Sequence, residues 1–148
     1  MPAIRWFLLG ALLANVLGLA TELVLFEHYE DGWQLIPLAL LGVAFLLVIW
    51  NALSRSAASV KIIRLVMLLF VIAGPVGIFF HYRENREFQM ESDPSAPAWN
   101  IFIKAIHAKA PPPLAPGAMT QLGLLGLIYS YRHPSLERTG VPQPVRSS

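Results

Sequence analysis

Long apolar segments separated by shorter polar ones form the main pattern along this chain. Four apolar segments occur, at residues 4–25, 33–53, 62–80 and 116–131. A helix needs about 20 mostly apolar residues to cross the hydrocarbon core of a bilayer. The pattern therefore predicts an all-α integral membrane protein with four transmembrane helices, paired as two hairpins in a single membrane domain covering residues 1–148.

The first and last of these segments each have informative flanking residues. Pro116 suits the first position of a helix, where its missing N–H costs no hydrogen bond. Pro134 ends the last segment, so we expect residues 132–148 to form a cytoplasmic tail. Arg5 before an apolar run is also a feature of signal peptides, but this run exceeds their usual core of about 7–15 residues. We expect it to remain as a transmembrane helix.

One amphipathic stretch interrupts the polar connection between the third and fourth segments. Residues 99–110 read WNIFIKAIHAKA, and Trp99, Phe102, Ile103 and Ile106 share one face at helical spacing. Such a helix lies in the membrane interface, with tryptophan at the level of the headgroups. The alternative is a helix that caps the outer mouth of the bundle.

Composition and charge add an orientation to this picture. The chain is 55% hydrophobic and 14% charged, whereas soluble domains carry about 25% charged residues. Cytoplasmic loops of membrane proteins are enriched in lysine and arginine. The basic residues that flank the segments therefore predict cytoplasmic N- and C-termini, in a plasma or inner membrane. Those on the predicted inside are Arg5, Arg55, Lys61, Arg64, Arg132, Arg138 and Arg146, and those outside are Arg83, Arg86, Lys104 and Lys109.

Several function classes are excluded or disfavoured. Nucleic-acid binding is not indicated, because the basic residues flank apolar segments instead of forming one patch. The absence of cysteine excludes disulfides and thiolate metal sites. No phosphate-binding loop, HExxH, GxSxG or dinucleotide-binding motif occurs, so enzymatic activity is not indicated.

Small residues recur at helical spacing in three of the segments. Helices in lipid associate through such residues because their backbones can then approach closely. We expect these stripes to meet in the interior of the bundle, while packing against a partner protein stays open. They comprise Ala11, Asn15 and Gly18 in the first segment, Gly74 and Gly77 in the third, and Gly123 and Gly126 in the fourth.

A carboxylate within a span is a candidate functional group, because its insertion into lipid is costly. Glu22 continues the stripe of the first segment, and acidic and histidine residues follow the first and third segments at similar depth. Imidazole and carboxylate groups suit a transition metal, and helical bundles can hold such a site. The candidate ligands for a metal at the outer face are Glu22, Glu27, His28, His81 and Glu84.

Two simpler interpretations of the same residues stay open. Arg83 or Arg86 could pair with Glu22 or Glu27 and so hold the outer ends of the helices together. Alternatively, Glu22 could extend along its helix to reach the membrane surface.

These observations favour a small non-enzymatic multi-pass membrane protein, an accessory or packing subunit of a membrane complex. Its partners would be the lipid bilayer and other membrane proteins or a second copy of itself. The alternative is a metal- or proton-handling protein that uses the outer glutamate and histidine cluster. A small transporter or membrane enzyme is a third hypothesis.

Overall fold

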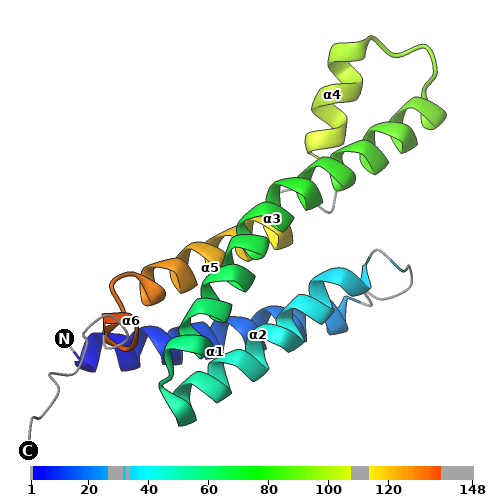
Figure 1. The fold of residues 1–148 in the computed structure, drawn as a ribbon. Helices are drawn as coiled ribbons and strands as arrows, with labels where there is room; N and C mark the ends of the chain where they lie inside the picture. Colours follow the sequence, from blue (N-terminus) through cyan, green and yellow to red (C-terminus); the bar gives the residue numbers. More distant parts are fainter. Residues whose placement is uncertain (1, 27–31, 33, 108–113, 138–148) are drawn as a thin grey trace, which may run out of the picture.

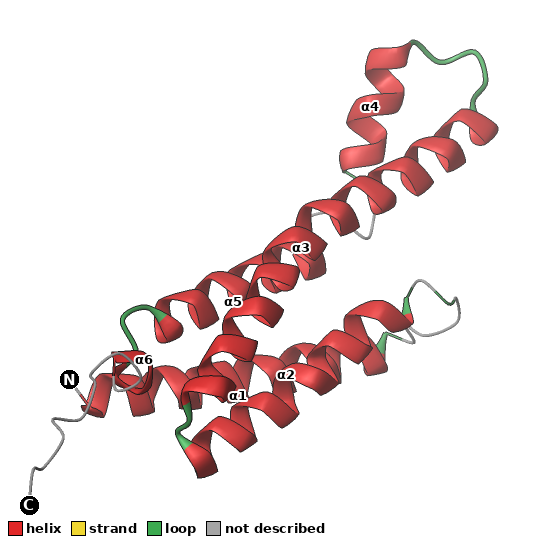
Figure 2. Ribbon diagram, viewed as in Figure 1, coloured by secondary structure: helices red, strands yellow, loops and turns green. Residues whose placement is uncertain are grey.

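Helices account for nearly all of the part of the chain that the structure describes. The computed structural model describes residues 2–26, 32, 34–107 and 114–137, and no strand occurs among them (Figure 2). The prediction of an all-α fold is confirmed. The helices are α1 (Pro2–Leu25), α2 (Leu35–Ser54), α3 (Ala57–Ser92), α4 (Ala98–Ile106), α5 (Leu114–Ser130) and α6 (Pro134–Glu137).

Three of these helices are long and apolar enough to cross a membrane. They cover Ala3–Leu25, Leu35–Ser54 and Ala57–Ser92, which correspond to the first three predicted spans. Helix α5 has 17 residues, about 26 Å at 1.5 Å per residue, which is shorter than a hydrocarbon core of about 30 Å. The chain therefore has the helices of a membrane protein, and a fourth crossing by α5 stays a prediction.

The four long helices form a closed ring of contacts. Helix α1 packs against α2, α2 against α3, α3 against α5, and α5 against α1, which completes a four-helix bundle (Figure 1). An apolar cavity of about 170 Å³ lies where all four helices contribute to its wall, and Leu23, Pro37, Gly77 and Met119 are among its lining residues. The interior of the bundle is therefore less completely filled at the end where α1 ends and α2 begins.

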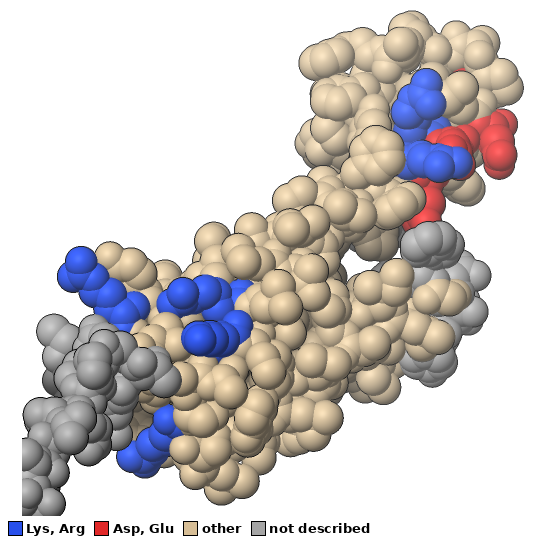
Figure 3. Space-filling view, viewed as in Figure 1, with Lys and Arg blue, Asp and Glu red and all other residues tan. Residues whose placement is uncertain are grey.

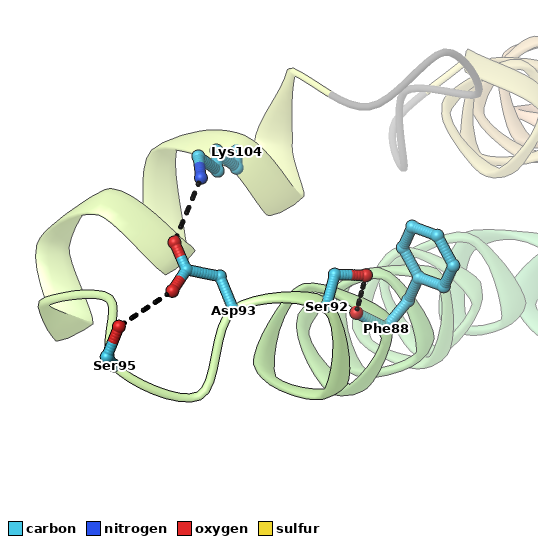
Figure 4. Close-up of polar contacts among 5 residues, drawn as sticks. All are labelled: Phe88, Ser92, Asp93, Ser95 and Lys104. Carbon is cyan, nitrogen blue, oxygen red and sulfur yellow. Dashed lines mark hydrogen bonds and ion pairs between the residues drawn. The ribbon is translucent and has the colours of Figure 1, made fainter.

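Helix α3 is the longest element and extends beyond the other three. Its 36 residues correspond to about 54 Å, well over the thickness of a hydrocarbon core. It continues past Pro75 and carries α4 alongside its C-terminal part (Figure 1). Asp93 closes the turn between them by accepting a 3.0 Å hydrogen bond from Ser95 and lying 3.8 Å from Lys104 (Figure 4).

The predicted amphipathic helix is present as α4. Its contacts test whether it caps the outer mouth of the bundle, but not whether it lies in a membrane interface. Helix α4 packs against α3 alone among the described helices, with Ala105 buried and its carbonyl accepting a hydrogen bond from Asn85. It does not contact the other helices of the bundle, so it is not a cap over its mouth. Its apolar residues Trp99, Phe102, Ile103 and Ile106 are all exposed, and their burial in a membrane interface stays a prediction.

The small-residue stripe of α1 was expected in the bundle interior, and this expectation is wrong. Ala11, Asn15, Gly18 and Glu22 do not lie in the bundle interior: Ala11 is half-buried, and the other three are exposed. The adjacent stripe, one residue further along, has the same spacing and is buried instead. Its large apolar side chains fill the interior, whereas the small ones would leave it empty. This buried stripe comprises Leu12, Val16, Leu19 and Leu23.

The glycines of α3 and α5, by contrast, lie where these two helices approach closely. A Cβ atom on Gly74 would lie 2.6 Å from the Pro116 carbonyl oxygen, and one on Gly123 would lie 2.7 Å from the Met67 carbonyl oxygen. Gly77 and Gly126 are similarly close to side chains of Pro116 and Met67. Helices α3 and α5 pack most extensively of all pairs, because these glycines let their backbones approach.

We therefore expect Gly123→Ala to destabilise the protein by about 1–3 kcal/mol, the usual cost of overpacking. Gly42→Ala is the matched control, because no atom lies within 4 Å of its Cβ position and alanine is the better helix former. Thermal unfolding in detergent should rank Gly123→Ala well below Gly42→Ala. Equal melting temperatures would show that the close approach of α3 and α5 is not required.

The number of membrane crossings can be measured with reporter fusions. If α5 crosses the membrane, fusions after Ser56 and after Ser148 should report the same side, and a fusion after Ser95 the opposite side. The basic residues beside Ser56 predict that this side is the cytoplasm. A reporter after Ser148 on the same side as Ser95 would mean three crossings, with α5 not spanning the bilayer.

Candidate functional site

Two arginines meet the C-terminal end of α5. Arg5 of α1 donates hydrogen bonds to the carbonyl oxygens of Tyr129 at 2.8 Å, Tyr131 at 3.2 Å and Arg132 at 2.8 Å. Arg64 of α3 donates to the carbonyl oxygen of Ser130 at 2.8 Å. The last carbonyl groups of a helix have no partner within the helix, and positive charge is favourable there. Helices α1 and α3 thus cap α5 from two sides.

A buried polar network lies beside this cap. Asn51 of α2 donates a hydrogen bond to the Tyr129 hydroxyl and accepts one from the Ser59 hydroxyl at 2.8 Å. Asn51 and Ser59 are at most 1% exposed, so water does not compete for these bonds. Ser59 belongs to α3, and Ser56 caps the start of that helix by accepting from the Ser59 N–H. The network therefore links α2, α3 and α5 at one end of the bundle.

Arg55 connects this end to α6. It ends α2 in a left-handed conformation, with φ at 46°, which costs a non-glycine residue about 1–3 kcal/mol. Its carbonyl oxygen accepts a 2.7 Å hydrogen bond from the Ser135 hydroxyl. Its guanidinium lies 4.7 Å from the centre of the Trp6 ring, within cation–π distance. An arginine here thus brings a cation to the surface of α1.

These residues surround a cleft of about 330 Å³, which we call the basic cleft. Its walls include Arg5, Trp6, Arg55, Tyr129 and His133. Burial, and secondarily the charge of Arg5, lowers the pKa of His133, so the imidazole is neutral near pH 7. Its Nδ1 accepts a hydrogen bond from the Ser135 N–H at 3.3 Å, which leaves the ring proton on Nε2.

The two ends of the molecule differ in charge: described cations gather at one end, whereas cations and carboxylates lie together at the other. Figure 3 shows lysine and arginine side chains near the N-terminus, and acidic side chains together with further lysine and arginine side chains near the α3–α4 hairpin. We call the first the basic end. Among the described side chains it carries five cations and no carboxylate: Arg5, Arg55, Lys61, Arg64 and Arg132. This asymmetry accords with the topology predicted from sequence, although which end faces the cytoplasm stays a prediction.

Glu22, His81 and Glu84, the candidate metal ligands that the structure describes, lie at the opposite end and form no recognisable site among themselves. His81 Nδ1 and Glu84 Oε2 are 3.8 Å apart on α3, while Glu22 is exposed on α1. Among the described residues, no group of three histidine or acidic side chains could hold a metal ion. Glu27 and His28 lie outside the described residues. Of the five predicted ligands, the structure therefore brings together His81 and Glu84.

The alternative polar lock is not formed with Glu22, and its other predicted carboxylate, Glu27, lies outside the described residues. The Nε of Arg83 donates a 2.7 Å hydrogen bond to Glu87 on the same helix, and no ion pair links Arg83 or Arg86 to Glu22 in the described structure. Glu22 instead lines a surface groove of about 340 Å³ between α1 and α5, together with Asn15, Gly18 and Ala118. We call this the α1–α5 groove.

The basic end contains the most highly connected polar residues, and none of them is among the site residues predicted from sequence. Asn51 is a lone amide within an apolar span, which is a recognisable signal for an interhelical hydrogen bond. From sequence, Arg5 and Arg64 indicate the topology of the chain, and Arg5 also the start of an apolar segment. Their role as caps depends on where α5 ends in space, which no spacing within their own segments shows.

Comparison with known proteins adds no relative: no protein-family model, no curated protein and no solved structure matches this chain.

Removing one hydroxyl should test the network. In Tyr129→Phe, the buried Asn51 amide loses its acceptor, which should cost about 1–3 kcal/mol of stability. Tyr131→Phe is the matched control, because Tyr131 is 64% exposed. Unfolding of the purified proteins in increasing sodium dodecyl sulfate measures the stability of Tyr129→Phe and of Tyr131→Phe. Equal stabilities would show that the Asn51–Tyr129 hydrogen bond contributes little.

Proposed function

We propose that this protein is a non-enzymatic accessory subunit of a membrane complex, and that α1 and α5 receive a helix of a partner protein in the α1–α5 groove. The observation that carries this proposal is a set of polar groups on the outer surface of an apolar helix. Asn15 and Glu22 are both exposed on α1, in a segment apolar enough to span a membrane.

Facing lipid would be unfavourable for these groups. A charged side chain near the middle of a membrane helix costs about 2.5–3.5 kcal/mol on insertion scales, and less near its end. The Asn15 amide donates one hydrogen bond, to the Ala11 carbonyl oxygen at 2.8 Å. The Glu22 carboxylate has no partner among the described residues. A second helix that supplied hydrogen-bond donors would remove this cost.

The shape of the groove suits a helix. No atom lies within 4 Å of a Cβ position on Gly18, so a neighbouring backbone can approach α1 there. Such close approach at small residues is how membrane helices associate. The large side chains of the adjacent stripe, Leu12, Val16, Leu19 and Leu23, hold α1 in the bundle, while Asn15, Gly18 and Glu22 stay exposed beside them.

A second copy of the chain is a poorer occupant than a different protein. Two copies in the same membrane with the same orientation would pair their α1 helices in parallel. Their Glu22 carboxylates would then approach each other, and like charges at this spacing repel. A partner helix with a hydroxyl, amide or basic side chain near Glu22 avoids this.

Site-specific photo-crosslinking in native membranes tests the proposal. A photoreactive residue at position 18 should give one discrete adduct with a different protein. The same residue at Gly42, which is also exposed with open space around it, should not. Adding Glu22→Lys to the position-18 variant should weaken the adduct severalfold. An adduct of twice the chain mass would indicate self-association, and lipid adducts alone would mean that the groove faces the bilayer.

A further inference from the structure

The basic cleft has more hydrogen-bond donors than the protein uses. Arg5 donates three hydrogen bonds to carbonyl oxygens, and a guanidinium has five N–H groups. The Arg55 guanidinium makes no hydrogen bond to any described residue, and it rests on the Trp6 ring. Neither arginine has a carboxylate within 4.0 Å among the described residues. Two cations therefore border one cleft with donors left over.

From this arrangement we propose that the basic cleft binds the phosphate group of an anionic phospholipid, from the leaflet that faces the basic end. Guanidinium groups match phosphate oxygens in geometry and charge, and can donate two parallel hydrogen bonds. His133 adds a neutral imidazole whose Nδ1 is already an acceptor, so its remaining ring nitrogen is a donor.

The surroundings favour a lipid over a free phosphate ion. The cleft is also lined by Leu9 and Ala52, and it lies at one end of the apolar helices α1 and α2, where the headgroups of one leaflet would be. Phe7 and Leu53 are 75% and 82% exposed at the same end. An acyl chain can lie against such surfaces, whereas inorganic phosphate gains nothing from them.

Arg55 is the most informative residue to change, because its side chain supports no described part of the fold by hydrogen bonding. Arg55→Gln removes the charge and the fork of donors. Lys61→Gln is the matched control: it removes one positive charge from the exposed surface of the same end, outside the cleft. Arg55→Lys keeps the charge without the fork, and provides a second test if Arg55→Gln does not fold.

The test is a titration of the full-length protein in detergent, with bound lipid counted by native mass spectrometry. Phosphatidylglycerol should bind with a stoichiometry of one at the tight site, and phosphatidylcholine much more weakly. Arg55→Gln should weaken binding of phosphatidylglycerol about tenfold, as expected for a lost charge-assisted hydrogen bond. The affinity of Arg55→Lys for phosphatidylglycerol should lie between those of the wild type and Arg55→Gln. Lys61→Gln should change this affinity by no more than about twofold.

Three results would overturn the proposal. Equal losses in Arg55→Gln and Lys61→Gln would mean diffuse attraction to the basic end without a site. Equal binding of phosphatidylcholine would mean that no anionic headgroup is selected. Displacement of phosphatidylglycerol by inorganic phosphate at matched concentration would mean that the cleft binds free phosphate and not a lipid.

Discussion

The C-terminal end of α5 imposes the constraint on which the rest of the bundle depends. A helix that ends near or within a membrane leaves carbonyl groups that water reaches poorly, and each unpaired group there costs several kcal/mol. Arg5 and Arg64 supply the missing donors, and they come from α1 and α3. Satisfying one helix end therefore fixes the positions of three helices.

The close packing of α3 and α5 follows from the same geometry. Once the end of α5 is held beside the start of α3, the two helices run along each other, and their glycines decide how near they come. Gly74 and Gly123 leave no room for a side chain. The Asn51–Tyr129–Ser59 network then ties α2 to this pair by hydrogen bonds. Glycines allow the approach of the helices, and the polar network favours one arrangement of them at the basic end.

The helices themselves could be predicted from the sequence, because lipid as a solvent demands long apolar segments. The boundaries of α1, α2 and α5 lie within two residues of the predicted ones. Helix α3 begins at Ala57 instead of residue 62 and continues through the polar residues 81–92, which apolar length alone does not predict. The face of α1 that packs could not be chosen correctly. Its small and large stripes have the same spacing and differ by one residue, so periodicity supports both, and only the volume to be filled between four helices selects the leucines.

The candidate site was harder to predict for a related reason. Carboxylates and histidines are dense near the predicted outer face, and this density favours a metal site there. Charged residues at the polar end of a long helix can be solvated, however, and α3 extends far enough to place Glu84 and Glu87 there. The residues that meet at the basic end are spread from position 5 to position 135, and their meeting depends on closure of the ring of helices.

The fold leaves polar groups unsatisfied in two places, the basic cleft and the α1–α5 groove. The groups are hydrogen-bond donors in the first and a carboxylate in the second. At the basic end there is a surplus of donors, on Arg5 and Arg55, beside a cleft. On the side of α1 there is a surplus of acceptor capacity, on Glu22, beside a groove. Hydrocarbon can satisfy neither, so in a membrane each surplus must be met by water, by lipid headgroups or by another protein. In the proposed topology the basic cleft would lie at the level of the headgroups, whose phosphates are acceptors, whereas the groove runs along α1. The proposed lipid site and the proposed partner site thus rest on different unsatisfied groups, donors at the basic end and a carboxylate on the side of α1.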